Sequence, residues 1–308
     1  MALSSKHILG MEHLSRQDIF KILSLAKQFK KQKKLPSTLK GKIVFNLFFE
    51  PSTRTQTSFE IAAKKLGATT IHINTAQSST VKGETLSDTA RTIEAMNPDV
   101  IVIRHPSSGA PYLLSKILKT PVINAGDGFH EHPTQALLDM LTIEETKGRL
   151  ADLRVLIVGD IAHSRIARSD IYGLTKMGAK TLVCGPPTLI PPFIEKLGVK
   201  VFYHLKEAVK ETDVIIMLRI QKERHNQLQF PSYREYIKKY CLNLETLKYA
   251  KSNVMIMHPG PLNRGVEIAP EIADGPYSVI LNQVSNGIVI RMALLHLMTN
   301  GEHLGTAH

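Results

Sequence analysis

The residues best suited to chemistry are hydroxyls, amides and cations that directly follow short apolar runs of the sequence. After the apolar run 43–49 the chain continues with Ser52, Thr53, Arg54 and Thr55, which open a stretch of helical periodicity. Such a turn directs backbone N–H groups, hydroxyls and a guanidinium at one point, at the positive end of a helix dipole. These residue types predict a phosphate site, and a plain helix N-cap beside a surface arginine is the alternative.

Other apolar runs end in groups of the same kind. They are followed by Arg104-His105-Pro106, His132-Pro133-Thr134-Gln135, Arg219-Ile220-Gln221 and His258-Pro259-Gly260-Pro261. Ligands of open parallel sheets bind outside the carboxyl ends of the strands, so these segments are candidates for one binding edge. Few acids accompany the cations, which predicts a site for small anions.

Several common kinds of site are not indicated by the sequence. It has no Gly-x-Gly-x-x-Gly turn, no Walker lysine motif and no nucleophile elbow. His130 and His132 lack a matching set of carboxylates or cysteines for a metal. Cys184 and Cys241 are not at metal-ligand spacing and are expected to be buried apolar residues. We therefore expect no dinucleotide, no metal and no covalent acyl intermediate.

Nine short runs rich in valine and isoleucine predict the strands that position these residues. Their bounds are 43–49, 70–73, 100–103, 122–123, 155–158, 181–183, 199–202, 214–218 and 254–257. Near-continuous apolar runs are typical of parallel strands buried on both faces. Lysine-rich helix ends closed by Gly67, Gly178 and Gly198 lead directly into a strand, as helices of an α/β fold do.

The order of these elements predicts the domain organisation. Four predicted strands precede residue 125 and five follow residue 153, with a predicted helix from Pro133 to Lys147 between them. The fold class is therefore α/β, with two doubly wound lobes, each a mainly parallel sheet flanked by helices, and a cleft between them. We predict domains over residues 1–147 and 148–283, with a last helix from about Val284 and the segment 284–308 packing back on the first domain. Ser15 and Asp18 have capping-box spacing and predict a helix ahead of the first strand.

Composition and charge exclude further classes. Of the 308 residues 43% are hydrophobic and 21% are charged, which is an ordinary globular composition. Eight lysines and no acid lie between Asp18 and Glu50, so most of the net charge of +12 is local. This cluster predicts a solvated helix end; a nucleic-acid surface is the alternative, without interleaved aromatic residues for base stacking. No apolar run approaches the roughly eighteen residues of a membrane helix and no secretory signal is evident, so we expect a soluble, cytoplasmic protein.

Six motifs occur in order along the chain, and together they resemble those of the aspartate/ornithine carbamoyltransferase family. They are Phe48-Phe49-Glu50-Pro51-Ser52-Thr53-Arg54-Thr55, Val81-Lys82-Gly83-Glu84-Thr85-Leu86-Ser87-Asp88-Thr89, Arg104-His105-Pro106, His132-Pro133-Thr134-Gln135, Arg219-Ile220-Gln221-Lys222-Glu223-Arg224 and His258-Pro259-Gly260-Pro261. Within the family the sequence is most similar to aspartate carbamoyltransferase catalytic chains. Ornithine enzymes typically have His-Cys-Leu-Pro at the last motif and a Ser-Met-Gly loop in place of Arg219-Ile220-Gln221.

The resemblance implies a role for each matching position. For carbamoyl phosphate it implies phosphate contacts from Ser52, Thr53, Arg54, Thr55 and Arg104, carbamoyl contacts from His132 and Gln135, and backbone carbonyls from Gly260 and Pro261. For L-aspartate it implies Lys82, Arg165, Arg219 and Gln221. The catalytic set would be Arg54, Thr55, Lys82, Arg104 and His132, and a loop with Ser78 and Lys82 would reach in from the adjacent subunit of a homotrimer.

The implied reaction is attack of the aspartate amine on carbamoyl phosphate to give N-carbamoyl-L-aspartate and phosphate, an early step of pyrimidine biosynthesis without a cofactor. Gln56 stands where many relatives have a second arginine, and assembly with regulatory chains or with a dihydroorotase is left open. Other interpretations are a carbamoyltransferase with a different acceptor and a non-catalytic binding relative.

Overall fold

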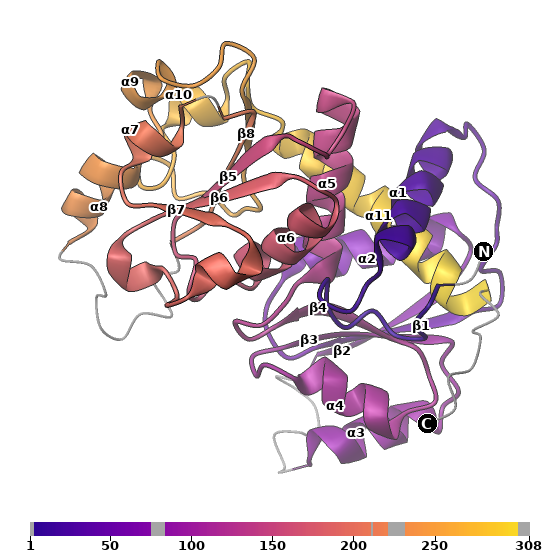
Figure 1. Ribbon diagram of the computed structural model, residues 1–308. Coiled ribbons are helices and arrows are strands. Elements are labelled where there is room, and N and C mark those ends of the chain that lie inside the picture. The colour runs from indigo at the N-terminus through magenta and orange to yellow at the C-terminus, as the bar shows by residue number, and fades with distance from the viewer. Residues whose placement is uncertain (1–2, 75–83, 211, 221–231, 301–308) are drawn as a thin grey trace. The chain divides into compact units, whose positions relative to one another are not determined.

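The computed structural model describes residues 3–74, 84–210, 212–220 and 232–300 (Figure 1). The chain forms two compact units, and each is described by itself. The first comprises Met1–Leu138 with Ser285–His308, and the second comprises Asp139–Val284.

The first unit contains a four-stranded parallel sheet in the order β2-β1-β3-β4. Its strands are β1 (Ile43–Phe48), β2 (Thr69–Asn74), β3 (Val100–His105) and β4 (Val122–Asp127). Its helices are α1 (Arg16–Lys31), α2 (Thr53–Lys65), α3 (Leu86–Glu94) and α4 (Ala110–Ile117). Figure 1 shows α3 and α4 on one face of the sheet and α1 and α2 on the other. Phe45, Leu47 and Ile101 of the sheet form one core cluster with Ile93 of α3 and Leu114 of α4.

The second unit contains a five-stranded parallel sheet in the order β7-β6-β5-β8-β9. Its strands are β5 (Arg154–Val158), β6 (Lys180–Cys184), β7 (Lys200–Phe202), β8 (Val214–Met217) and β9 (Met255–Met257). Its helices are α6 (Arg165–Lys176), α7 (Leu205–Ala208), α8 (Tyr233–Tyr240), α9 (Leu244–Leu247) and α10 (Pro270–Ala273), with 3-10 turns η3 (Pro187–Leu189) and η4 (Ile194–Leu197). Leu156, Ile215 and Ile256 of the strands pack with Leu205 of α7 and Tyr236 of α8.

Two helices contain the points where the chain passes from one unit to the other. The chain changes units after Leu138 within α5 (Pro133–Lys147) and after Val284 within α11 (Ile280–Asn300). The bounds of α5 agree with the sequence prediction, because Pro133 is tolerated at a first helical position and Gly148, with φ 76°, ends the helix.

The predicted fold class is confirmed, since all nine apolar runs form parallel strands and divide four and five between the sheets. Gly67, Gly178 and Gly198 adopt the left-handed conformation expected of helix ends. The capping box of Ser15 and Asp18 is present at the start of α1. The start predicted for the last helix is corrected, because α11 begins at Ile280 rather than at Val284. No proline or glycine separates these two positions, so nothing local stops the extra turn.

Candidate functional site

In each sheet the predicted site residues lie at or after the ends of three strands that are neighbours in the sheet. The order of the strands reverses between β1 and β3 in the first unit and between β5 and β8 in the second. Ligands of open parallel sheets bind at such a reversal, outside the carboxyl ends of the strands. Ser52–Thr55, Arg104 and His132 lie at or after the ends of the neighbours β1, β3 and β4; Arg165, Arg219 and Gly260 come after β5, β8 and β9.

The N-terminus of α2 differs from the other starts with a serine or threonine N-cap among the described helices. Ser52 occupies the N-cap position, yet its side chain makes no capping hydrogen bond. The equivalent side chains of α1, α3, α6 and α8 all accept a capping N–H. The first turn of α2 contains no acid but does contain exposed Arg54 and buried Thr55. The alternative of a plain serine N-cap is therefore not observed, and the positive end of this helix is suited to an anion.

Arg104 lies at the end of β3 with its side chain mostly buried. Its Nε donates to Glu50 Oε2 at 3.2 Å and its Nη1 to the Ala125 carbonyl at 3.4 Å. The Phe49 N–H donates to the Arg104 carbonyl at 2.8 Å, which joins the ends of β1 and β3. Sequence reasoning did not assign Glu50 a role, although it lies in the quoted motif; it fixes the guanidinium that is expected to meet phosphate.

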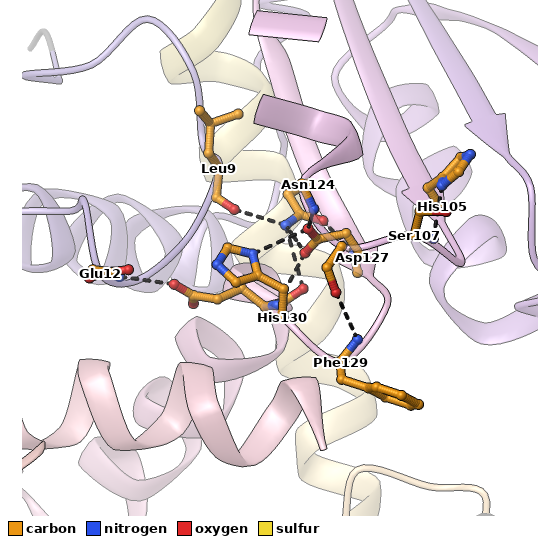
Figure 2. A network of polar contacts seen from close by, with 12 residues as sticks. Leu9, Glu12, His105, Ser107, Asn124, Asp127, Phe129 and His130 are labelled. Carbon is orange, nitrogen blue, oxygen red and sulfur yellow. Dashed lines mark hydrogen bonds and ion pairs between the residues drawn. The ribbon is translucent and has the colours of Figure 1, made fainter. Parts of the chain in front are cut away.

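A buried polar network holds the turn that follows β4 (Figure 2). Asn124 Nδ2 donates to Asp127 Oδ1 and to the Leu9 carbonyl, each at 2.8 Å. Asp127 Oδ2 accepts from the Gly109 N–H at 2.7 Å and lies 3.2 Å from His130 Nδ1. These contacts join the start of α4 and the N-terminal segment to the turn that leads to His132.

Glu131 extends this network directly beside His132. The Glu131 carboxylate is fully buried and accepts from the N–H groups of Met11 at 2.8 Å and Glu12 at 3.1 Å. Even a Cβ atom at Gly10 would overlap it. His132 and Gln135 are themselves buried, so their position depends on this frame.

His105 is the last residue of β3 and is half-buried. Its ring packs edge-on against Phe49, and its Nδ1 accepts from the Ser107 N–H at 2.9 Å. Burial lowers the pKa of His105, although the charges of Glu50 and Asp127 oppose the shift. A neutral imidazole is therefore favoured here near pH 7.

In the second unit Arg165 is the first residue of α6 and is buried, while Arg219 follows β8 and is half-buried. The N-cap Ser164 accepts from the Ala167 N–H at 3.1 Å, so this helix end is satisfied by its own side chain. Gly260 and Pro261 follow β9 and are joined by a cis peptide bond. The structure thus places predicted residues on three adjacent strand ends of this sheet. Gln221 and the loop residues Ser78 and Lys82 lie outside the described residues.

The described residues give no indication of a metal centre or a reactive thiol. They contain no group of three or more histidine, cysteine, aspartate or glutamate side chains able to hold a metal. Cys184 and Cys241 are buried as expected, and burial raises the pKa of Cys184 to about 12 and that of Cys241 to about 11. Among the described helices, none is sufficiently long and apolar to cross a membrane.

Comparison with known proteins matches two consecutive family domains to the chain. Residues 6–145 match the family description "Aspartate/ornithine carbamoyltransferase, carbamoyl-P binding domain", and residues 151–298 match its "Asp/Orn binding domain". The chain is 60% identical to the aspartate carbamoyltransferase catalytic subunit of Syntrophus aciditrophicus over 299 residues, 96% of this chain and 97% of that protein. It is 55% identical to the subunit of the same name from Moorella thermoacetica, covering 98% of this chain and 99% of that one.

Solved structures of carbamoyltransferases are also similar to this chain in fold and in sequence. An ornithine carbamoyltransferase from Pyrococcus furiosus superposes with a TM-score of 0.89 at 30% identity, covering 98% of this chain and 99% of that one. The aspartate transcarbamoylase of Trypanosoma cruzi in complex with N-(phosphonacetyl)-L-aspartic acid superposes with a TM-score of 0.87 at 32% identity, covering 96% of each chain. Shared sequence over nearly the whole length, and not only a shared fold, shows that the chain belongs to the aspartate/ornithine carbamoyltransferase family.

Proposed function

We propose that the protein is an aspartate carbamoyltransferase, which transfers the carbamoyl group of carbamoyl phosphate to L-aspartate. The observation that carries this proposal is the pair of strand-order reversals, each flanked by two arginines: Arg54 and Arg104 in one unit, Arg165 and Arg219 in the other. One pair suits a phosphate and the other a dicarboxylate, since arginine forms paired hydrogen bonds with both kinds of group. The curated relatives of 54–60% identity carry the same name.

In this proposal residues 1–147, with the C-terminal segment 284–308, form the carbamoyl-phosphate domain. The start of α2 holds the phosphate through Ser52, Thr53, Arg54 and Thr55, and the absence of a capping hydrogen bond from the Ser52 side chain supports this assignment. Arg104 adds a second guanidinium. His132 and Gln135 contact the carbamoyl group, together with the backbone carbonyls of Gly260 and Pro261.

Residues 148–283 form the aspartate domain. Arg165 and Arg219 hold the two carboxylates, with Gln221 and Lys82 as further contacts. Both arginines follow strands that are adjacent at the reversal of this sheet, which supports a shared ligand. Ornithine is the alternative acceptor, because the similar Pyrococcus structure is an ornithine carbamoyltransferase. Ornithine carries a cationic side chain, which a pair of arginines would repel.

The chemistry follows from these contacts. The aspartate amine attacks the carbonyl carbon of carbamoyl phosphate, negative charge develops on the carbonyl oxygen, and phosphate leaves. Arg54, Thr55, Arg104 and His132 donate hydrogen bonds to the oxygens that gain charge, and each such donor is worth about 3–4 kcal/mol of barrier. The proton of the attacking amine leaves with the phosphate, which is the base nearest to it in the reaction.

The deciding experiment is an acceptor comparison. The purified protein is supplied with carbamoyl phosphate and either L-aspartate or L-ornithine, and the carbamoylated product is measured. We expect transfer to aspartate and none to ornithine. An Arg54→Ala variant serves as the background control. Transfer to ornithine, or equal release of phosphate without an acceptor, would reject the proposal.

We further propose a homotrimer in which Ser78 and Lys82 complete the site of the neighbouring subunit. Arg54→Ala and Lys82→Ala trimers would each be nearly inactive. When the two variants are dissociated, mixed one to one and reassembled at random, three quarters of the trimers are hybrids. Each hybrid has one intact site in three, so about a quarter of the parent activity should return by symmetry. If separated hybrids stay as inactive as their parents, Lys82 acts within its own subunit.

The cellular setting is part of the same proposal. We place the enzyme in the cytoplasm, where thiols such as Cys184 and Cys241 remain reduced, and in pyrimidine biosynthesis. Assembly with regulatory chains or with a dihydroorotase stays open.

A further inference from the structure

Glu267 is a fully buried carboxylate to which the proposed reaction gives no role. It lies between β9 and α10, in the second unit. Its Oε1 accepts the Asn263 N–H at 2.5 Å and lies 3.2 Å from His258 Nε2. A buried carboxylate is costly, so one that accepts hydrogen bonds from two points of the same loop is well placed to fix that loop.

The contact between Glu267 and His258 determines which nitrogen of the His258 ring carries the proton. The Gly260 N–H donates to His258 Nδ1 at 2.8 Å, so Nδ1 must be unprotonated. The proton of the neutral ring is therefore on Nε2, where it is donated to Glu267. Glu267 thus selects the one tautomer of His258 that can accept from the Gly260 backbone.

The contact between Glu267 and Asn263 links Glu267 to the segment that contains Arg219. Asn263, whose backbone N–H is held by Glu267, donates from its side-chain Nδ2 to the carbonyl of Ile220 at 3.1 Å. Ile220 is the residue after Arg219. One carboxylate therefore connects the turn after β9 with the turn after β8.

Buried groups also anchor the far side of His258. The His258 N–H donates to Gln283 Oε1 at 2.9 Å, and Gln283 Nε2 donates to Asp139 Oδ1 at 2.7 Å. Gln283 belongs to α11 and Asp139 to α5, so rigid helices hold the base of the turn. His258 is 1% exposed, which leaves the Glu267 contact shielded from water.

We propose that Glu267 is a positioning residue for the part of the site that the second unit supplies. It holds the proposed carbamoyl contacts Gly260 and Pro261 through neutral His258, and the proposed aspartate contact Arg219 through Asn263. This inference rests on the proposed function for its kinetic consequence. Its structural part, the fixed tautomer of His258, does not depend on which reaction the protein catalyses.

The test compares Glu267→Ala, Glu267→Gln and Asn263→Ala with Glu271→Gln, a matched change at an exposed glutamate of α10. We expect Glu267→Ala to lower kcat/KM for aspartate about 100-fold, the cost of misplacing reacting groups by roughly 1 Å. Binding of carbamoyl phosphate to the free enzyme should weaken less, by under about tenfold, because its phosphate contacts lie in the other unit and only the hydrogen bonds to the Gly260 and Pro261 carbonyls are disturbed. Glu267→Gln keeps the accepting oxygen and should recover most of the loss, and Glu271→Gln should match the parent.

A spectroscopic readout separates positioning from general loss of structure. With ¹⁵N-labelled histidine, and with His258→Asn to assign the signal, the parent should show His258 as the neutral Nε2–H form. Glu267→Gln should preserve that form, Glu267→Ala should lose it, and Asn263→Ala should keep it while raising the aspartate KM. If Glu267→Ala does not fold, the Gln and Asn263 variants carry the test alone.

Two outcomes would overturn the inference: an aspartate kcat/KM within twofold of the parent in folded Glu267→Ala or in Asn263→Ala, or a His258 ring that is protonated or in the Nδ1–H form in the parent. Failure of the proposed function looks different. The parent itself would then not carbamoylate aspartate, and the His258 spectra would still decide whether Glu267 fixes the ring.

Discussion

The helices α2 and α6 each follow the first strand of their unit, and their N-termini differ in capping and in the exposure of the nearby arginine. At α2 the Ser52 side chain makes no capping bond and Arg54 is exposed. At α6 the Ser164 side chain caps the helix and Arg165 is buried. At α2 no capping bond from Ser52 competes with a ligand for the backbone N–H groups, whereas at α6 the Ser164 side chain already accepts the Ala167 N–H. The two helix starts are therefore built differently on the same scaffold.

This difference suits the ligands proposed for them. A phosphate has many oxygens in a compact group and can accept several N–H groups from one helix end. The two carboxylates of aspartate are further apart, and separate side chains on neighbouring loops reach them better. Loops need their own support, which in the second unit comes from Glu267 and His258.

The largest expected effect is at the exposed arginine of α2. Arg54→Ala should reduce kcat about 100- to 1,000-fold, because the removed guanidinium would face the charge that develops on the departing phosphate. Steady-state kinetics measure this, with the exposed Arg91→Ala of α3 as the control. A loss below tenfold would mean that the helix end alone supplies the phosphate site.

The next effect tests whether the two units divide the ligands. Arg104→Ala should raise the carbamoyl phosphate KM by roughly 10- to 100-fold, the range for losing a hydrogen bond to a charged group. Arg219→Ala should do the same for aspartate and leave carbamoyl phosphate binding nearly unchanged. If both variants weaken both substrates equally, the division of labour between the sheets is wrong.

A third prediction concerns Asp170, a buried carboxyl group of α6. Burial, together with the nearby negative charge of Asp139, raises the pKa of Asp170 well above its ordinary value of 3.8. The folded state therefore keeps a proton that the unfolded chain releases above that value, so this group costs stability as pH rises until its raised pKa is passed. Asp170→Asn should remove this cost.

The measurement is the urea midpoint at a series of pH values. Asp170→Asn should match the parent near pH 3.5 and exceed it increasingly toward neutral pH, by on the order of 1 kcal/mol or more. The exposed Glu195→Gln serves as control and should show no such trend. A variant less stable than the parent at pH 8 would show that the Asp170 carboxylate is ionised and stabilising in the fold.

Local signals in the sequence predicted most of the fold. Pro133 and Gly148 marked both ends of α5, and the run 155–158 of valine, leucine and isoleucine after Arg154 is buried as a central strand must be. The start of α11 was misplaced because its first turn has no cap or proline to mark it.

The candidate site was predictable only in part. Arg54 and Arg104 stand at strand ends, where residue type and position already suggest a ligand. Glu131 and Glu267 escaped notice, because their partners are distant in the sequence or are backbone groups that no motif records. Glu131 accepts from residues about 120 positions away. The roles of individual residues, including Lys82, came from family resemblance and remain predictions.

The smallest effect tests the opening contrast most directly, by removing the same hydroxyl from both helix starts. Ser164→Ala should cost about 1 kcal/mol of stability, because it removes the acceptor for the Ala167 N–H. Ser52→Ala should change stability by only a few tenths of a kcal/mol, since no capping bond is lost. It should instead raise the carbamoyl phosphate KM about tenfold, the low end of the range for losing a hydrogen bond to a charged group. Urea midpoints and KM values measured on both variants give a two-by-two comparison. Equal destabilisation by the two changes would show that Ser52 is an ordinary cap in solution, and the distinction drawn between α2 and α6 would then have no basis.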